Sequence, residues 1–165
     1  MQAIKAYYQI YNDDFSRILN KIEDCARTCY KSEDKIKEGS AEKMVAALIR
    51  SDHTAMLEHA SLTVKFVCDR AMSHEIVRHR LASFAQESQR YVNYGNQDEV
   101  TFIIPDGMEY KSESWNIWKN AMKNAEKAYL DLLKAGCKPQ DARAVLPNST
   151  KTEIVMTANL REWRW

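Results

Sequence analysis

Apolar side chains recur at helical spacing in three stretches of the chain. Between residues 15 and 29 they recur every three or four positions, which places them on one face of a helix. The same spacing predicts a second helix from Ser40, whose hydroxyl is expected to cap it. The clearest pattern covers 112–135 and ends beside Gly136, a residue type that commonly terminates helices. The chain is therefore predicted to contain three amphipathic helices.

Capping residues and a proline predict shorter helical segments. Asp69 is expected to cap a helix over 70–80, and Pro139 is expected to open one over 139–146. The last residues, 159–165, have the pattern of a helix that is just starting. The first two of these segments separate the predicted strands from one another.

Alternating apolar and polar residues predict the strands. The alternation is clearest over 61–69 and 150–158, as is typical of half-buried strands. Residues 89–95 and 100–105 are expected to form two further strands, and 3–11 an edge strand. Because strands and helices follow no regular strand–helix–strand order, we predict an α+β fold with a mixed, largely antiparallel sheet flanked by helices. The 4 glycines and 3 prolines form no linker-like stretch, so a single domain is expected.

Charge and cysteine content narrow the classes of protein to consider. The chain has 24 Lys and Arg against 23 Asp and Glu, so its net charge of +1 gives no general attraction to nucleic acid or to a membrane. The N-terminus lacks the pattern of a signal peptide, and no apolar run reaches the roughly 20 residues of a membrane span. The four cysteines lack zinc-site spacing and are expected to be small buried residues: Cys25, Cys29, Cys68 and Cys137. We therefore expect a reduced, cytoplasmic protein without a nucleic-acid or membrane partner.

Residues 77–95 concentrate positive charge and short polar side chains. Arg78, His79 and Arg80 end the predicted helix. Hydrogen-bonding side chains follow in an expected loop: Ser83, Gln86, Glu87, Ser88, Gln89 and Arg90. Guanidinium groups match the oxygens of phosphate and carboxylate groups, so this segment favours a site for an anionic ligand. The alternative is that the cations only offset the dipole at the C-terminal end of the helix.

The histidines and Ser88 raise two alternatives, a metal site and nucleophilic catalysis. His53 and His59 flank a glutamate in an order that differs from the zincin pattern, and His74 has Arg78 one helical turn away, so no metal is predicted. Ser88 is a candidate nucleophile, but the chain has no G-x-S-x-G elbow. Neither Gly-rich nucleotide fingerprint is present, so a bound nucleotide or flavin would be held by side chains.

Three separated segments carry a family resemblance. Arg-His-Arg at 78–80, followed after seven residues by Ser88, resembles the signature of the flavin-dependent thymidylate synthases. Upstream, "HTAMLEHASLTVKF" at 53–66 is similar to the family's His-x-x-x-x-Glu-His segment, and "ARAVLPNSTKTEIVMTANLREW" at 142–163 is similar to its second conserved block. The resemblance implies that residues 1–165 form a domain of this family.

The resemblance also implies a reaction and an assembly. Members of the family methylate dUMP to dTMP, with methylenetetrahydrofolate as carbon donor, reduced FAD as hydride source and NADPH as the reductant of the flavin. The cofactors carry the difficult chemistry, while the protein supplies binding, orientation and electrostatics. Family sites are shared among the subunits of a homotetramer, so a closed symmetric assembly is expected here.

Roles carry over from the family to matching positions. The positions that hold FAD correspond to Ala55, Arg78, His79, Arg80, Gln86, Asn159, Leu160 and Arg161. The positions that bind dUMP correspond to Glu75, Arg78, Gln86, Glu87, Ser88, Gln89, Arg90 and Arg143. His53 matches a histidine near the flavin ring, and Ser88 is read as a substrate-holding residue rather than a nucleophile, because the family needs no attack on uracil by the protein.

Two departures from the family pattern bear on activity. Ala55 stands where many members carry a hydroxyl that helps to hold FAD. Members usually continue for several tens of residues beyond the position of Trp165, with an arginine that contacts the uracil and is taken as catalytic. The catalytic residue is therefore left unassigned, and a chain shortened at its C-terminus is expected. The alternative is a homologue that binds FAD or a nucleotide without methylating dUMP, or that acts on another uracil-containing substrate.

Overall fold

The computed structural model describes residues 1–11, 14–97 and 99–164, and these fall into two compact units. Unit 1 consists of residues 1–8, 66–78 and 85–155. Unit 2 consists of residues 9–65, 79–84 and 156–165. Each unit is therefore built from three segments that alternate along the chain.

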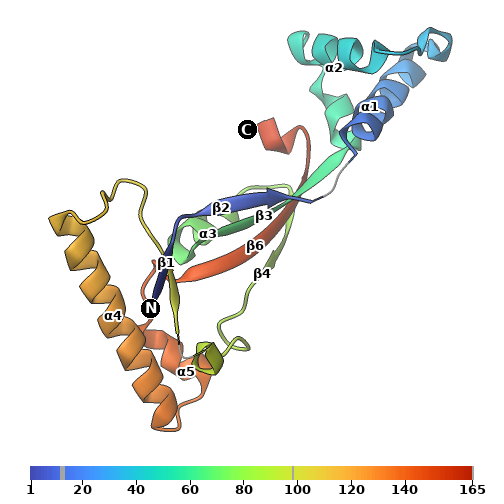
Figure 1. Ribbon diagram of the computed structural model, residues 1–165. Helices are drawn as coiled ribbons and strands as arrows, with labels where there is room; N and C mark the ends of the chain where they lie inside the picture. Colours follow the sequence, from blue (N-terminus) through green and yellow to red (C-terminus); the bar gives the residue numbers. More distant parts are fainter. Residues whose placement is uncertain (12–13, 98, 165) are drawn as a thin grey trace. The chain divides into compact units, whose positions relative to one another are not determined.

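Two packed helices form the core of unit 2. Helix α1 (Phe15–Tyr30) and helix α2 (Ser40–Arg50) lie side by side (Figure 1). The Asp14 carboxylate caps α1 as an acceptor for the backbone N–H groups of Ser16 and Arg17, at 3.0 and 3.2 Å. The buried side chains between the helices and the following 3-10 turn are Ile22, Ala26, Val45, Leu48, Leu57 and Ala60. The periodicity of the sequence thus located both helices.

The predicted cap of α2 is wrong. Gly39, with φ of +70°, is the N-cap residue, and Ser40 is the first residue of the helix. The Ser40 hydroxyl instead lies 2.8 Å from the carboxylate of Glu23, which is 2% exposed. A buried carboxylate needs hydrogen-bond donors. The Ser40 hydroxyl therefore bonds to Glu23 instead of capping the helix.

Four strands form a sheet in the order β2–β3–β6–β4. They are β2 (Tyr7–Ile10), β3 (Ser61–Asp69), β6 (Lys151–Asn159) and β4 (Ala82–Gln86). Hydrogen bonds join Leu160 to Ala60 and Thr63 to Thr157, a register in which β3 and β6 run antiparallel. The expected α+β class with a largely antiparallel sheet is confirmed, and β2 lies at the edge of the sheet.

The sequence placed one strand wrongly. Residues 82–86, expected as a polar loop, form β4, in which half-buried and exposed side chains alternate. The expected strand over 89–95 is not one. The backbone N–H groups of Tyr91 and Val92 both donate to the Ser88 carbonyl, at 3.1 and 3.0 Å, which folds this segment into a turn. Small residues in 82–86 hid the alternation on which the prediction depends.

A second sheet and a long helix organise unit 1. Strand β1 (Gln2–Ile4) pairs in parallel with β5 (Thr101–Ile103), so the expected strand over 3–11 is divided into β1 and β2. Helix α4 (Glu113–Lys134) lies beside the short α5 (Pro139–Ala142) (Figure 1). The core buries Tyr94, Val100, Phe102, Trp115, Trp118, Met122, Tyr129 and Ala142.

Ser112 caps α4 by accepting from the Trp115 backbone N–H at 3.1 Å, and Gly136 follows the helix with φ of +91°. The helix predicted over 112–135 is confirmed at both ends, since a positive φ suits glycine. At the end of the described chain, where a helix was expected to start, Glu162–Arg164 form a short 3-10 helix, and Trp165 lies outside the described residues. None of the helices in the described residues is long and apolar enough to cross a membrane.

Helix α3 (Arg70–Ile76) follows β3 directly. It is shorter than the expected helix over 70–80 and ends before the Arg-His-Arg run. The Asp69 carboxylate accepts from the Met72 backbone N–H at 2.7 Å, as the sequence predicts for an N-cap.

Replacing Asp69 by alanine should therefore lower the free energy of unfolding by about 1 kcal/mol, because the Met72 N–H loses its acceptor. Asp69→Asn keeps a side-chain acceptor and should stay within about 0.5 kcal/mol of the parent. Urea unfolding followed by circular dichroism measures both. Equal losses in the two variants would show that the charge of Asp69, rather than its cap, stabilises the protein.

Candidate functional site

The residues that the sequence assigns to two ligands divide between the two units. Those assigned to flavin lie in unit 2, apart from Arg78 and Gln86: His53, Ala55, His79, Arg80, Asn159, Leu160 and Arg161. Those assigned to dUMP lie in unit 1: Glu75, Arg78, Gln86, Glu87, Ser88, Gln89, Arg90 and Arg143. The two sets are therefore carried by different parts of the fold.

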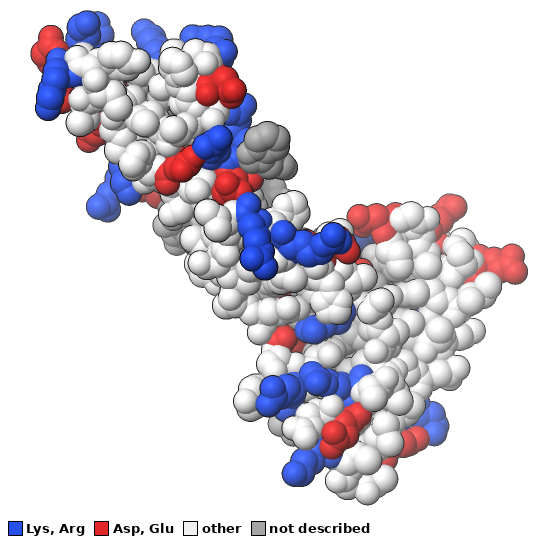
Figure 2. All heavy atoms as spheres, turned by 180° about the vertical axis from the view of Figure 1, so that it is seen from behind, with Lys and Arg blue, Asp and Glu red and all other residues white. Residues whose placement is uncertain are grey.

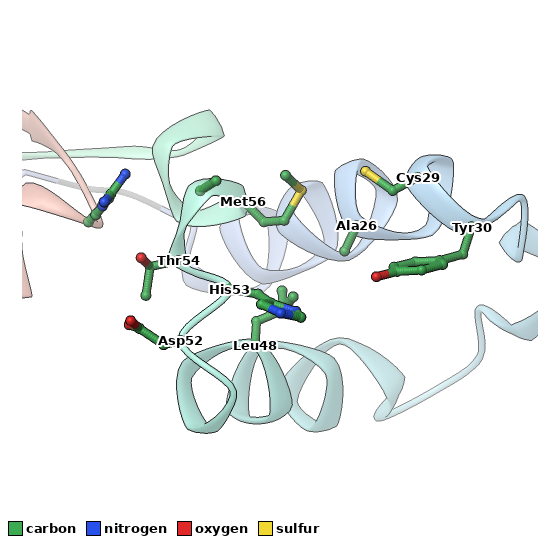
Figure 3. Close-up of a pocket in the computed structure, with 10 residues that line it drawn as sticks. Ala26, Cys29, Tyr30, Leu48, Asp52, His53, Thr54 and Met56 are labelled. Atoms are coloured by element: carbon green, nitrogen blue, oxygen red, sulfur yellow. The ribbon is translucent and has the colours of Figure 1, made fainter.

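The largest gathering of flavin-assigned residues in unit 2 lines a cavity of about 440 Å³. Its walls are Ala26, Cys29, Tyr30, Leu48, Asp52, His53, Thr54, Ala55, Met56 and Arg161. Figure 3 shows the rings of His53 and Tyr30 in the space between α1 and α2. The cavity brings three predicted residues, His53, Ala55 and Arg161, to one mostly apolar site of a size suited to a small molecule or part of a cofactor.

The end of α2 positions His53. Asp52 adopts the left-handed conformation, with φ of +57°, and its N–H donates to the Ile49 carbonyl at 3.3 Å. The His53 N–H reaches back to the Leu48 carbonyl at 2.9 Å. These two bonds form a Schellman motif, which satisfies the last carbonyls of the helix and turns the chain sharply. His53 and the buried Thr54 are thereby placed at the wall of the cavity.

The C-terminal end of α1 supplies residues that sequence reasoning missed. Cys29 is exposed at the cavity and Cys25 is half-buried, so the expectation of four buried cysteines is wrong. Cys68 is buried, and burial raises the pKa of its thiol to about 11. Tyr30 lies one helical turn beyond the buried Ala26. The four-residue spacing from Ala26 is the signal in the sequence that could have identified Tyr30. It points to the cavity only when α2 is known to pack beside α1.

Residues 159–161 are already tied into unit 2. The Leu160 N–H donates to the Ala60 carbonyl at 2.9 Å, and the Asn159 side-chain oxygen accepts from the Glu162 N–H at 2.9 Å. Arg161 forms an ion pair with Glu58, and that hydrogen bond raises the pKa of the guanidinium. Arg161 is therefore held at the cavity with its charge in place.

His79 and Arg80 line a different hollow of about 310 Å³ in unit 2, together with Leu81, Ala82, Met156 and Glu162. Both side chains are exposed. The structure therefore brings His79 and Arg80 together, but not into the cavity of His53. Arg78 belongs to unit 1, where its guanidinium pairs with the exposed carboxylate of Glu75 at 2.8 Å.

In unit 1, Gln86 belongs to a half-buried polar network. Its side-chain NH₂ group lies 2.8 Å from the Ser73 hydroxyl and 3.3 Å from the Thr152 hydroxyl. The Arg70 guanidinium lies 3.4 Å from the same Thr152 hydroxyl. Ser73 and Thr152 are fully buried, so these bonds satisfy polar groups that water does not reach. Sequence reasoning missed Ser73, Thr152 and Arg70.

Glu87 is held by groups from other parts of unit 1. One carboxylate oxygen accepts from the Tyr94 hydroxyl at 2.8 Å, and the other lies 3.1 Å from the Lys151 ammonium. Lys151 also contacts Glu153 at 2.6 Å. Burial alone would lower the pKa of Lys151, but the hydrogen bonds to Glu153 and Glu87 outweigh it and raise that pKa. The carboxylate that the sequence placed among four neighbouring cations is therefore paired with a lysine 64 residues away.

The remaining dUMP-assigned residues of unit 1 make mostly local contacts. The Ser88 hydroxyl accepts from the Arg90 N–H at 3.3 Å, and the Arg90 guanidinium lies 5.6 Å from the centre of the Tyr91 ring. The half-buried Arg143 donates to the Gln140 carbonyl at 3.0 Å, at the end of α5. Neither arginine has a carboxylate partner among the contacts of the described residues, so both can pair with an anion.

Charged groups outside these sites are mixed in sign. On the face that Figure 2 shows, both Lys or Arg and Asp or Glu side chains lie over α1 and α2. Within the described residues, no group of three or more His, Cys, Asp or Glu side chains has the arrangement of a metal site. Attraction of an anionic ligand must therefore come from local arginines rather than from a broad basic surface.

Comparisons with known proteins agree on one family. The sequence model of the family described as "Thymidylate synthase complementing protein" matches residues 14–165. A curated protein from Pyrococcus abyssi, named flavin-dependent thymidylate synthase, is 38% identical over 134 residues, which cover 80% of this chain and 55% of that protein. Similar proteins with the same name come from Geobacter sulfurreducens, at 37% identity, and Corynebacterium efficiens, also at 37%. This chain spans 62% and 63% of their lengths.

A solved structure has the same fold. It is a UMP/dUMP methylase, PolB, from Streptomyces cacaoi, bound with 5-Br dUMP. The TM-score is 0.76 with 24% sequence identity, and the match covers 98% of this chain and 76% of that chain. At this level of identity the likeness is one of fold.

Proposed function

Because this chain belongs to the thymidylate synthase complementing protein family, whose curated relatives are named flavin-dependent thymidylate synthases, we propose that it takes part in the reductive methylation of dUMP to dTMP. The family resemblance recognised in three sequence segments is thereby confirmed. FAD is the proposed flavin, methylenetetrahydrofolate the carbon donor and NADPH the reductant. The chain spans about half the length of several curated relatives, so this activity is proposed for the whole protein.

The observation that carries the proposal is the cavity of unit 2. An apolar space of about 440 Å³ with two aromatic rings and a guanidinium at its wall suits one ring system of a flavin dinucleotide. Tyr30 and His53 would contact a ring, and Arg161, which pairs with Glu58 through Nη1, would offer its remaining donors to a phosphate group. His79, Arg80, Asn159 and Leu160 would extend the flavin contacts in the same unit. When bound, the flavin supplies the hydride that completes the new methyl group.

Unit 1 is proposed to bind the nucleotide. Arg90 and Arg143 would pair with the phosphate dianion through charge-assisted hydrogen bonds. Gln86, Ser88 and Gln89 offer short polar side chains to the base and sugar. Ser88 holds the substrate in this proposal and does not attack it, because its hydroxyl has no base among its described contacts and instead accepts from Arg90. Glu75 and Arg78 complete the proposed nucleotide residues.

The assembly and setting of the protein follow from the same proposal. We propose a homotetramer whose subunits contribute flavin and nucleotide contacts to shared sites. We place the activity in the cytoplasm, because the four cysteines form no disulfide within the described residues.

A cavity-filling variant tests the flavin assignment. Ala55 is exposed at the cavity wall, so Ala55→Trp should occupy the space and weaken FAD binding at least about tenfold, which corresponds to 1.4 kcal/mol. The binding of dUMP should be unaffected, because its proposed residues lie in unit 1. Titration of the protein with FAD, followed by flavin fluorescence, measures the change.

The matched control is Ala71→Trp, which adds the same side chain at an exposed position of α3 in unit 1, a residue that does not line the cavity. It should bind FAD like the parent. FAD binding by Ala55→Trp at the parental affinity would place the flavin elsewhere. Separate titrations of the same variants with dUMP and with UMP check the nucleotide site. They report whether that site distinguishes the two sugars.

A further inference from the structure

Glu87 is fixed at both its backbone and its side chain. Its N–H donates to the Glu153 carbonyl on β6 at 2.8 Å, and its carbonyl oxygen lies 3.5 Å from the Arg70 guanidinium. Its carboxylate accepts from Tyr94 and pairs with Lys151. The side chain is 13% exposed, so these partners replace most of its contact with water. A residue whose two carboxylate oxygens are both engaged in this way is a support rather than a free ligand.

The turn that follows Glu87 is closed on itself. The Ser88 carbonyl accepts from the Tyr91 and Val92 N–H groups, and the Ser88 hydroxyl accepts from the Arg90 N–H. Tyr94 then returns to Glu87 through its hydroxyl at 2.8 Å. Glu87 and Tyr94 therefore bracket the turn that carries Ser88 and Arg90. A movement of the Glu87 carboxylate would move both ends of that turn.

Lys151 ties this turn to the sheet. It is a residue of β6, and its ammonium lies between the carboxylates of Glu87 and Glu153, at 3.1 and 2.6 Å. Its side chain is 20% exposed. The hydroxyl of the buried Tyr94 stays protonated, since burial and the Glu87 carboxylate raise its pKa. Among the ion pairs of the described residues, Lys151 is therefore the cation that pairs with the Glu87 carboxylate.

We propose that Lys151 is a positioning residue for nucleotide binding: by pairing with Glu87, it holds the turn from Ser88 to Arg90 in the conformation that receives dUMP. This inference rests on the proposed function. It assigns Glu87 to the support of the turn instead of to contact with dUMP. Lys151 acts through Glu87 and touches no reacting group.

The test measures dUMP binding by calorimetry on FAD-loaded protein. Lys151→Met leaves the Glu87 carboxylate without its cation and frees the turn, so the dissociation constant for dUMP should rise by about tenfold to a hundredfold, as for other misplaced binding groups. FAD content should not change, because the proposed flavin cavity lies in unit 2. Lys151→Arg restores a cation and should bind dUMP within about threefold of the parent, a difference of less than 1 kcal/mol.

A double variant separates positioning from general damage. In Lys151→Met with Glu87→Gln, the neutral amide still accepts from Tyr94 and position 87 carries no charge, while the carboxylate of Glu153, which also loses Lys151, is 34% exposed to water. The dUMP affinity should therefore recover most of the loss. The control is Lys127→Met, the same change at a 78% exposed lysine of α4 in the same unit, which should bind dUMP like the parent. Where Lys151→Met fails to fold, Lys151→Gln takes its place with the same expected weakening.

Parental dUMP affinity in Lys151→Met would overturn the inference. So would parallel loss of FAD and dUMP binding, or failure of both Lys151→Arg and the double variant to restore dUMP affinity, because a merely structural role predicts these results. Absence of dUMP binding by the parent protein would overturn the proposed function itself, and this inference with it.

Discussion

Arg143→Ala should weaken dUMP binding by at least about thirtyfold, because truncating one partner of a desolvated charge pair costs about 2–5 kcal/mol. Arg143 is half-buried, and among the described residues its guanidinium makes one hydrogen bond, to the Gln140 carbonyl. The loss of this side chain should therefore weaken nucleotide binding more than it lowers the stability of the fold. FAD uptake should stay near the parental level, since the flavin-assigned cavity belongs to unit 2. Calorimetric titration with dUMP and the flavin absorbance of the loaded protein provide the two readings.

Arg143→Lys and Lys123→Ala are the comparisons for this variant. The lysine keeps the charge but not the planar fork of donors, so an intermediate affinity is expected. Lys123 is an exposed cation of α4, and its removal should leave dUMP binding unchanged. If Arg143→Ala and Lys123→Ala weaken dUMP binding equally, Arg143 contributes only general electrostatic attraction and makes no direct contact with the phosphate. Loss of FAD and dUMP together would contradict the division of roles between the units.

Arg27→Ala should lower the free energy of unfolding by about 3–5 kcal/mol, the range measured when one partner of a buried ion pair is removed. The Arg27 guanidinium contacts one oxygen of Glu23 through Nε at 3.2 Å and Nη2 at 2.9 Å, and the Ser40 hydroxyl contacts the other at 2.8 Å. Glu23 is 2% exposed, so without Arg27 its charge keeps one neutral partner. Because α1 also supplies Tyr30 to the cavity, FAD affinity should fall as well. Guanidinium chloride unfolding measures the stability.

Two further variants isolate the role of the charge. Arg27→Ala combined with Glu23→Gln removes the uncompensated carboxylate and should regain a large part of the lost stability. Arg17→Ala truncates an exposed arginine of the same helix and should stay within about 0.5 kcal/mol of the parent. A loss in Arg27→Ala no larger than that in Arg17→Ala would show that the pair with Glu23 does not stabilise α1.

Elements with long periodic patterns could be predicted from the sequence, and elements defined by distant contacts could not. Helices α1 and α4 and strands β3 and β6 have patterns of nine or more residues, and their bounds lie close to those expected. Strand β4 has five residues, two of them alanine, and was mistaken for a ligand-binding loop. Helix α3 ends at Ile76, earlier than expected, and the Val77 and Arg78 N–H groups donate to the Ser73 and Glu75 carbonyls at its end, at 3.2 and 3.1 Å.

The residues of the candidate site also differ in whether the sequence could identify them. The Arg-His-Arg segment and residues 86–90 could be singled out because their chemistry is concentrated in the sequence. Lys151 and Arg70 could not, since their contacts with Glu87 and Thr152 span 64 and 82 residues. Tyr30 was missed for a related reason, because its role depends on the packing of α1 beside α2.

The most direct test of the central claim is the visible absorption spectrum of the protein after loading with FAD and removal of unbound flavin, recorded before and after addition of dUMP. A protein that holds the flavin for reaction with the nucleotide should retain the flavin bands, and dUMP should shift them. Arg143→Ala should retain the bands and require a much higher dUMP concentration for the same shift. A colourless protein, or flavin bands that dUMP leaves unchanged, would contradict the account.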